Sequence, residues 1–497
     1  MAINNFKNAD GDSSRLSVGS VPESQTALTK EVHPARQGTA FVTVYMLACT
    51  LLGLVHLFLG ANFLIIVMAL SSILISALPT AVYGWRDLPS LFSLLAGVRY
   101  VTSALVWKLT EPTPIDSGLF DPETSFTLVL VGTSAVTAAV FSAHILWPRR
   151  PLIAERYDAR GFAFLLAVGL IGTIIALGLR SSGGTAPGGV QVLLSDCFII
   201  LAMAYMGFNI STRKVVFTPG LIALLIGFTF IGIAFNTRQG VLEMLLAAFI
   251  MYICYGFKPS KATIALASVP AMFFFLYVSP AITDARVYRQ THSAVEMIGV
   301  TLDAIGNRIA GYTTDTTAID FDTNRFALRY TESRNTLVER FVAIQQLDFL
   351  AALVQRNGAI GTDRFWAGFT ELAPAFLVPE KTIIMHGGYV LTVYGLLPPG
   401  VETAFEVTPY ASAFSFGGYQ FTFGAIFVGF LLFFLILRLL CPELKNSIMA
   451  AFILAAYIHP LTAQSVWTPF SILVRSLPFE ILLFSIAIIV SKAAPKT

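Results

Sequence analysis

Blocks of about 20 predominantly apolar residues, separated by short polar connections, fill most of this 497-residue sequence. A helix of about 20 apolar residues spans the hydrocarbon core of a bilayer. A helix is also one of the few structures that satisfy all their backbone hydrogen bonds in lipid. Charged residues make up 12% of the chain, against about 25% in soluble domains. The sequence therefore predicts an all-α polytopic membrane protein.

The apolar blocks predict about twelve transmembrane helices. The eighth block is short and the last contains Arg475, so eleven or thirteen helices remain alternatives. The expected segments are 38–58, 61–83, 89–108, 124–147, 161–180, 189–210, 217–235, 241–256, 262–282, 417–440, 447–466 and 470–490. Nine of them thus fall in residues 38–282, and three fall in residues 417–497.

The basic residues of the short connections predict the orientation. They gather after the second, fourth, sixth and eighth segments, whereas the alternate connections are acidic or neutral. Cytoplasmic loops carry the excess of Lys and Arg, so we expect both termini in the cytoplasm and a location in the bacterial inner membrane. Residues 1–37 are polar and lack the apolar core of a signal peptide. We expect them to form a disordered cytoplasmic tail.

Residues 283–416 form the one long connection, and its predicted side is extracytoplasmic. Unstructured loops longer than about 15 residues are uncommon in compact proteins, and aromatic residues are scattered through this one. Within residues 334–358, apolar residues recur at helical spacing up to the Asn357-Gly358 pair. We predict a large, mostly helical loop that lies against the membrane.

The long loop is rich in arginine rather than lysine. Arginine presents a planar set of donors that matches phosphate and carboxylate groups, so an acidic or phosphorylated ligand is one interpretation. Ordinary pairing with the fourteen Asp and Glu residues of the loop is the alternative. The ten basic residues are Arg286, Arg289, Arg308, Arg325, Arg329, Arg334, Arg340, Arg356, Arg364 and Lys381.

Arg238 lies between two strongly apolar runs, in Asn236-Thr237-Arg238-Gln239. Ionisable residues at membrane depth are costly and usually functional or paired. Arg238 is therefore a candidate ligand for an anionic lipid head group. A snorkelling side chain, or a pair with Glu243 or Asp196, is the structural alternative.

Other classes of site find no support in the sequence. It contains no basic tract interleaved with aromatic residues, so nucleic acid is not an expected partner. The four cysteines lack the spacing of disulfides or metal ligands and are expected to be small buried apolar residues. They are Cys49, Cys197, Cys254 and Cys441.

Three short motifs resemble a known family. "NTRQGVLEMLLAAF" (236–249) resembles a helix start shared by O-antigen polymerases and ligases. "GFTELAPAFLVPEKT" (368–382) is similar to the end of the large periplasmic loop in Wzy-type oligosaccharide repeat-unit polymerases. "TPYASAFSFGGYQFTFGAIFVGFLLFFLI" (408–436) looks like their return from the loop into the membrane. The layout, with a large periplasmic loop before the last helices, is also similar.

The resemblance implies a GT-C-like membrane glycosyltransferase that uses no cofactor, metal or nucleotide sugar. Its substrates would be undecaprenyl-pyrophosphate-linked glycans, which it would polymerise at the periplasmic face into a surface polysaccharide or exopolysaccharide. The lipid bilayer would surround it, and a chain-length regulator and a flippase of the same pathway would be its partners. The sequence contains no cluster of His and Cys residues with the spacing of metal ligands, which agrees with metal independence.

The implied chemistry assigns roles to residues of this sequence. Cations must neutralise the pyrophosphate as it leaves, and Arg238 is the first candidate, followed by Arg334, Arg340, Arg364 and Lys381. A base for the acceptor hydroxyl would be His386, with Glu332, Glu339 and Glu406 as alternatives. His459 precedes Pro460, a pair that predicts a helix kink.

Two other functions remain open. An O-antigen ligase would use the same donor with another acceptor, but the His-Asn pair common in ligases is absent, since Gly387 follows His386. A transporter or flippase of lipid-linked oligosaccharide would place more ionisable residues at the bilayer midplane, in matched halves. Asp196 and Glu243 are the main ones expected here.

Overall fold

The structure is a computed structural model. It describes residues 34–147, 151, 157–181, 188–213, 218–234, 246–252, 254–255, 268–269, 272–288, 294–310, 330, 341–373, 387–396, 407–445 and 447–492. Over these ranges the elements are helices, and the β structure is limited to a bridge between Asp87 and Glu443. The predicted all-α class is confirmed.

Seven helical stretches within the described ranges are long and apolar enough to cross a membrane. They lie in α1 (Pro34–Phe58), α2 (Phe63–Tyr83), the stretch Leu88–Thr110, α5 (Pro122–Leu146), α6 (Ala159–Ser181), α18 (Pro409–Leu440) and the stretch Thr468–Lys492. Three shorter apolar helices lie in α7 (Gly188–Arg213), α8 (Pro219–Ala234) and α19 (Ile448–Ala463). These ten stretches match ten of the twelve expected segments. Segments 241–256 and 262–282 are described only in part, so the count of twelve stays a prediction.

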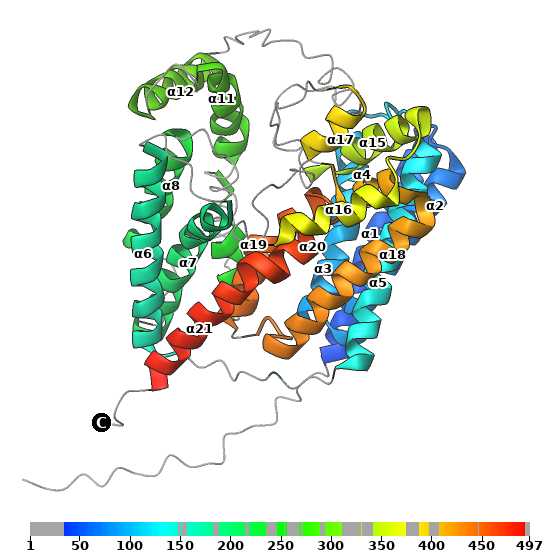
Figure 1. Ribbon diagram of the computed structural model, residues 1–497. Helices are drawn as coiled ribbons and strands as arrows, with labels where there is room; N and C mark the ends of the chain where they lie inside the picture. Colours follow the sequence, from blue (N-terminus) through cyan, green and yellow to red (C-terminus); the bar gives the residue numbers. More distant parts are fainter. Residues whose placement is uncertain are drawn as a thin grey trace, which may run out of the picture.

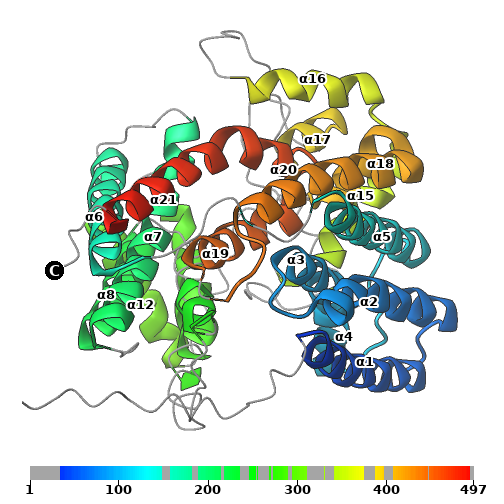
Figure 2. The ribbon, with the colours of Figure 1, turned by 90° about the horizontal axis from the view of Figure 1, so that it is seen from below.

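The membrane helices form two groups (Figures 1 and 2). One contains α1, α2, α5 and α18 with the helix Leu88–Thr110, and the other contains α6, α7 and α8. Helix α19 lies between the groups and contacts both α3 (Leu88–Gly97) and α7. Helix α21 (Leu477–Lys492) crosses toward the second group and packs on α6.

Small residues let these helices approach closely. This is common in membrane proteins, because lipid tails are as apolar as the side chains and helix association depends on close packing instead. A Cβ atom on Gly169 of α6 would lie 2.8 Å from the backbone of Leu201 in α7. A Cβ atom on Gly132 of α5 would lie 2.5 Å from the ring of Tyr410 in α18. Neither position can hold a larger side chain without a shift of its neighbour.

Two of the membrane-crossing stretches are interrupted by a π-helical turn. The third runs from α3 through η2 (Val98–Thr102) into α4 (Ser103–Thr110). The last runs from α20 (Thr468–Ser471) through η5 (Ile472–Ser476) into α21. Such turns are rare and frequently occur at functional sites. Each of these two contains an arginine, Arg99 and Arg475.

Part of the long loop folds onto one end of the first helix group, which we call the loop end (Figure 1). Helices α15 (Ile344–Asn357), α16 (Thr362–Leu372) and α17 (Gly387–Val393) all contact or lie beside α18 there. The predicted loop helix is confirmed over 344–357, and it ends at Gly358, whose φ of 84° suits glycine. Residues 334–340 lie outside the described ranges.

Two differences from the expected boundaries concern the helices that flank the loop. Helix α18 begins at Pro409 rather than 417, and non-helical angles at Gly417 and Gly418 break it where the predicted segment started. On the other side, η3 (Phe274–Val278), α11 (Ser279–Asp284) and η4 (Ala285–Tyr288) lead into α12 (Ala294–Ile309), which packs on α8.

An ionic cluster lies at the opposite end of the first group. Asp87 caps α3 by accepting hydrogen bonds from the Ser90 N–H and hydroxyl. Its Oδ1 lies 3.0 Å from His144 Nε2 and 3.5 Å from Arg438 Nη1. Arg438 is 1% exposed and donates from Nε to the Trp147 carbonyl at 3.0 Å. These contacts join α3, α5 and α18.

Candidate functional site

Arg99 is a half-buried cation inside a membrane-crossing helix, eleven residues beyond the start of α3 at Leu88. Its Nη1 donates to His459 Nδ1 at 3.0 Å, to Thr462 Oγ1 at 2.7 Å and to the His459 carbonyl at 3.3 Å. All three acceptors belong to the last turns of α19. A charge at membrane depth is costly unless such groups surround it.

The contact with Arg99 determines which ring nitrogen of His459 carries the proton. A guanidinium only donates hydrogen bonds and keeps its proton, so Nδ1 must act as the acceptor. The imidazole is therefore neutral, with its proton on Nε2. Arg99 thus sets both the orientation and the tautomer of His459.

The end of α19 is enclosed by aromatic and loop residues. The Tyr100 hydroxyl donates to the Thr462 carbonyl at 2.8 Å, and the Tyr100 ring stacks on Tyr410 with centroids 4.5 Å apart. The Ala463 carbonyl accepts from the Thr408 N–H at 3.0 Å. Helix α19 therefore ends inside the protein, beneath the first turns of α18.

The long loop contacts the π-helical turn directly. The Ala343 N–H, just before α15, donates to the Arg99 carbonyl at 3.3 Å, and the Ser103 hydroxyl also donates to that carbonyl. A π-helical turn displaces carbonyls from the regular i to i−4 pattern, so this carbonyl needs other donors. The start of α15 is thereby positioned over the backbone of Arg99.

Asp348 anchors α15 to the connection before α5. Its carboxylate accepts from the Phe120 N–H at 2.7 Å, the Asp121 N–H at 3.0 Å and the Ser125 hydroxyl at 2.9 Å. Burial raises the pKa of Asp348, and the nearby Asp121 charge adds to this, although the three hydrogen bonds oppose it.

Tyr330 forms a second contact between the loop and the membrane helices. Its hydroxyl donates to the Ile115 carbonyl at 2.7 Å, and Lys108 Nζ lies 4.4 Å from the centre of its ring. Lys108 is 2% exposed and also pairs with Glu111 at 2.9 Å. A cation over an aromatic ring is stabilised by the ring quadrupole, so this contact helps to hold the loop end together.

An aromatic cluster covers the adjoining part of the loop end. Trp467 is fully buried, stacks on Phe365 of α16 with centroids 5.6 Å apart, and donates from Nε1 to the Phe365 carbonyl at 3.2 Å. Phe416 meets the Trp467 ring edge-on at 4.9 Å. These contacts pack α16 against the turn between α19 and α20.

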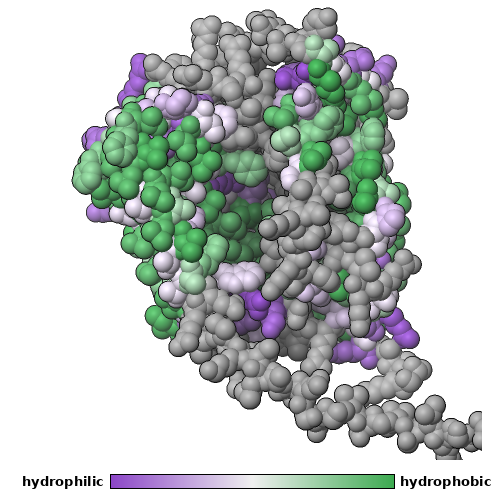
Figure 3. All heavy atoms as spheres, turned by 180° about the vertical axis from the view of Figure 1, so that it is seen from behind, coloured by the Kyte–Doolittle hydropathy of each residue, from purple (hydrophilic) through white to green (hydrophobic). Residues whose placement is uncertain are grey.

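The molecule is hollowed between its two helix groups. Figure 3 shows an opening between two apolar lobes, with hydrophilic surface visible inside it. Apolar side chains such as Leu170, Ile174 and Phe230 remain exposed on the second group, as expected for surfaces that face lipid.

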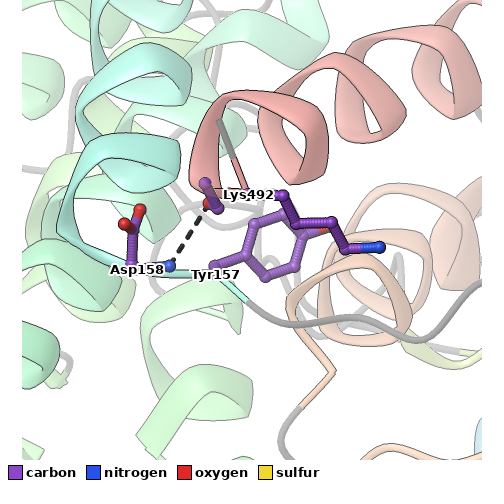
Figure 4. A pocket seen from close by; sticks show the side chains of 4 residues that line it. Tyr157, Asp158 and Lys492 are labelled. Carbon is purple, nitrogen blue, oxygen red and sulfur yellow. Dashed lines mark hydrogen bonds between the residues drawn. The ribbon is translucent and has the colours of Figure 1, made fainter. Parts of the chain in front are cut away.

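A separate pocket of about 310 Å³ lies between the start of α6 and the end of α21. Tyr157, Asp158, Ser491 and Lys492 line it, and the Asp158 N–H donates to the Ser491 hydroxyl at 3.3 Å (Figure 4). The pocket is at the end of the bundle away from α15 and α16 (Figure 1). It is therefore distinct from the Arg99 site.

Most of the predicted site residues lie outside the described ranges. These are Arg238, Arg334, Arg340, Lys381, His386, Glu332 and Glu406, with the alternative base Glu339 and with Glu243, the possible ion-pair partner of Arg238. Arg364 is described and is exposed on α16, two positions after its first residue. The roles assigned to all of them remain predictions.

Arg99 and its partners were missed by the sequence reasoning. The sequence did contain a signal for Arg99, because this residue falls inside the predicted segment 89–108. A charge within a membrane segment is usually functional or paired, as was argued for Arg238. His459 was interpreted only as part of a His-Pro kink. Its link to Arg99, 360 positions away, has no local signature. The four cysteines are buried, as expected.

Comparisons with known proteins find no relative. No family model matches the sequence, and no curated protein or solved structure is similar to it. Among the residues that the structure describes, no group of three His, Cys, Asp or Glu side chains is placed to hold a metal ion.

Proposed function

We propose that this membrane protein is a glycosyltransferase that polymerises undecaprenyl-pyrophosphate-linked oligosaccharide repeat units. The observation that carries the proposal is the placement of Arg99. A permanent positive charge is held at membrane depth directly beneath a folded loop. A lipid pyrophosphate brings its negative charge to that depth, while its glycan extends toward the loop. The motif resemblances described above point to the same class of reaction.

The reaction requires charge stabilisation more than covalent catalysis. The acceptor hydroxyl oxygen attacks the anomeric carbon of the donor glycan and loses its proton. The bond from that carbon to the pyrophosphate oxygen breaks, and the lipid pyrophosphate leaves with the bonding electrons. A fixed cation near the leaving oxygen favours this step. Arg99 adds to Arg238, Arg334, Arg340, Arg364 and Lys381 as candidate cations, and His386, Glu332 and Glu406 remain the candidate bases.

In this proposal the loop end is periplasmic and both termini are cytoplasmic, in the bacterial inner membrane. The contacts of Ala343 with Arg99 and of Asp348 with residues 120–125 place the loop over the site. The hollow between the helix groups offers a lateral route for a lipid carrier (Figure 3).

The test is the glycan profile of a deletion strain complemented with wild type, Arg99→Gln or Arg356→Gln. Arg356 is an exposed arginine at the end of α15 and serves as the matched control. Removing one electrostatic donor from an active site typically lowers turnover by about 100-fold or more. We expect the ladder of repeat units to collapse to a single unit for Arg99→Gln at normal protein level, and to persist for Arg356→Gln. An unchanged ladder for Arg99→Gln contradicts the proposal.

Transport of the same lipid-linked glycan is the second candidate. It is favoured by two buried carboxyl groups at membrane depth, Asp196 and Glu480, since such groups often mark transport pathways. The fate of the repeat units in the deletion strain distinguishes a polymerase from a transporter and from a ligase. Single repeat units that reach the outer face without being joined indicate a polymerase, units retained inside indicate a transporter, and polymer that stays on its carrier indicates a ligase.

A further inference from the structure

His144 is a buried imidazole in the last turn of α5, and each of its ring nitrogens faces an acceptor. Its side chain is 4% exposed. Nδ1 lies 2.8 Å from the Val140 carbonyl oxygen, and Nε2 lies 3.0 Å from Asp87 Oδ1. A carbonyl and a carboxylate offer only lone pairs, and a neutral imidazole carries only one N–H. Either neutral tautomer of His144 would therefore place an unprotonated nitrogen against one of these two oxygens.

The groups around Asp87 favour its ionised form. Its Oδ2 accepts hydrogen bonds from the Ser90 N–H at 3.0 Å and from the Ser90 hydroxyl, and Arg438 Nη1 lies 3.5 Å from its Oδ1. Hydrogen bonds to a carboxylate and a nearby cation both favour the charged form. The hydrogen in the contact between His144 and Asp87 is therefore carried by Nε2. Because Nδ1 is protonated as well, His144 is an imidazolium.

Among the described residues, the other groups that pack around this pair are an aromatic ring and a second cation. From α2, the Tyr83 ring stacks on His144 with centroids 3.5 Å apart, and the ring quadrupole attracts a cation in that position. From α18, Arg438 is 1% exposed and approaches the same oxygen of Asp87. Glu443, whose backbone pairs with that of Asp87, has an exposed side chain. One buried carboxylate is thus shared by two buried cations, of which the guanidinium keeps its proton.

We propose that Asp87 and His144 form a buried site that holds one proton, at the end of the bundle opposite the loop end. While the proton is bound, the hydrogen bond between the two side chains ties the start of α3 to the end of α5. Without it, Nε2 and Oδ1 are two acceptors in contact, which is unfavourable. Arg438, 3.5 Å away, is then positioned to bind Oδ1. The proton therefore determines whether Asp87 is bound to α5 or to α18. This inference does not rest on the proposed glycosyl transfer.

Nitrogen-15 NMR of the full-length protein in lipid nanodiscs, with labelled histidine, tests the proposal. An imidazolium lacks the signal of an unprotonated ring nitrogen. A solvent-exposed histidine has a pKa of about 6.5, so at a pH of about 7.5 it is mostly neutral. We expect one imidazolium among the six histidines at that pH, and its loss in both His144→Gln and Asp87→Asn. An imidazolium signal that survives either substitution overturns the proposal.

The matched control is His56→Gln. His56 is also fully buried, but it has a single acceptor, the Leu105 carbonyl at 2.8 Å from Nε2. Its ring is therefore expected to be neutral, and its substitution should leave the imidazolium signal unchanged. The wild-type spectrum is decisive by itself: neutral rings for all six histidines overturn the proposal even if no variant folds.

Melting temperatures measured over a range of pH test what the proton does to the packing. A proton that the folded protein binds more tightly stabilises it at low pH, and this contribution is lost as the pH rises through the range in which the proton leaves. We expect the wild-type melting temperature to fall where the imidazolium signal disappears. His144→Gln can still donate one hydrogen bond to Asp87 but does not titrate, so its melting temperature should fall less over that range. Equal pH dependence in the two proteins contradicts a proton that ties α3 to α5.

Discussion

Arg99 Nη1 lies 3.0 Å from His459 Nδ1, although the two residues are 360 positions apart in the chain. The contact joins the π-helical turn of the third membrane-crossing stretch to the end of α19. It also places a permanent positive charge and a neutral imidazole with a defined tautomer side by side.

The Arg99–His459 pair should couple energetically as well as geometrically. We expect the unfolding free energies of Arg99→Gln and His459→Gln to be non-additive, with a coupling of about 0.5–3 kcal/mol, because residues in one hydrogen-bonded network share partners. Thermal unfolding of both single variants and the double variant in detergent measures this. If the unfolding free energy of the double variant falls by the sum of the decreases in the two single variants, direct coupling is contradicted.

Asp348 should determine whether the loop stays docked. Asp348→Ala removes the acceptor of three hydrogen bonds and leaves two backbone N–H groups, of Phe120 and Asp121, without that partner. We expect a loss of about 3 kcal/mol and faster proteolysis within 341–373. Asp363→Ala, at an exposed position in the first turn of α16, is the control and should change neither. Equal protease resistance in the wild type and Asp348→Ala would show that the anchor is dispensable.

The close approach of α5 to α18 should make Gly132 sensitive to a single methyl group. In Gly132→Ala the new Cβ meets the Tyr410 ring at 2.5 Å, so we expect destabilisation of about 1–3 kcal/mol from overpacking. Gly424→Ala adds the same methyl group where no atom lies within 4 Å. That variant should be neutral or slightly more stable, because alanine favours the helix. Melting temperatures of the two variants compare the sites, and a reversed order contradicts the observed packing.

Asp158 should make the start of α6 sensitive to acid (Figure 4). The slight burial of this exposed side chain acts to raise its pKa, but hydrogen bonds from the Gly161 N–H and the Arg160 N–H, together with the nearby Arg160 charge, outweigh this. The pKa of Asp158 is therefore below its ordinary value of 3.8. A carboxylate with a lowered folded-state pKa stabilises the protein above its unfolded-state pKa, and the contribution is lost as the pH falls through the folded-state value.

The matched variant for Asp158 is Asp158→Asn, which can still cap α6 but does not titrate. We expect the wild type to be the more stable protein near neutral pH. The difference in melting temperature should shrink as the pH is lowered below about 4. A difference that does not depend on pH would show that the charge of Asp158 contributes nothing.

Several elements were predictable because their causes are local. A run of about 20 apolar residues becomes a membrane helix because its backbone can satisfy its hydrogen bonds within the run. The start of α5 at Pro122 follows from Asp121, whose side chain accepts from the Thr124 N–H. The end of α15 follows from Gly358. The start of α18 was missed, because its first turns are buried under the loop rather than in lipid.

The amino-acid sequence alone determined the class of this protein, the approximate spans of its helices and the existence of an ordered helical loop. Only the tertiary structure decided which polar groups meet inside the bundle, as Arg99 meets His459 and Tyr457 meets Glu480. The physical reason is that lipid and protein interior are equally apolar, so the hydropathy of a membrane helix does not reveal which face packs against a neighbour. The partners of a buried charge depend on packing between helices that lie hundreds of residues apart.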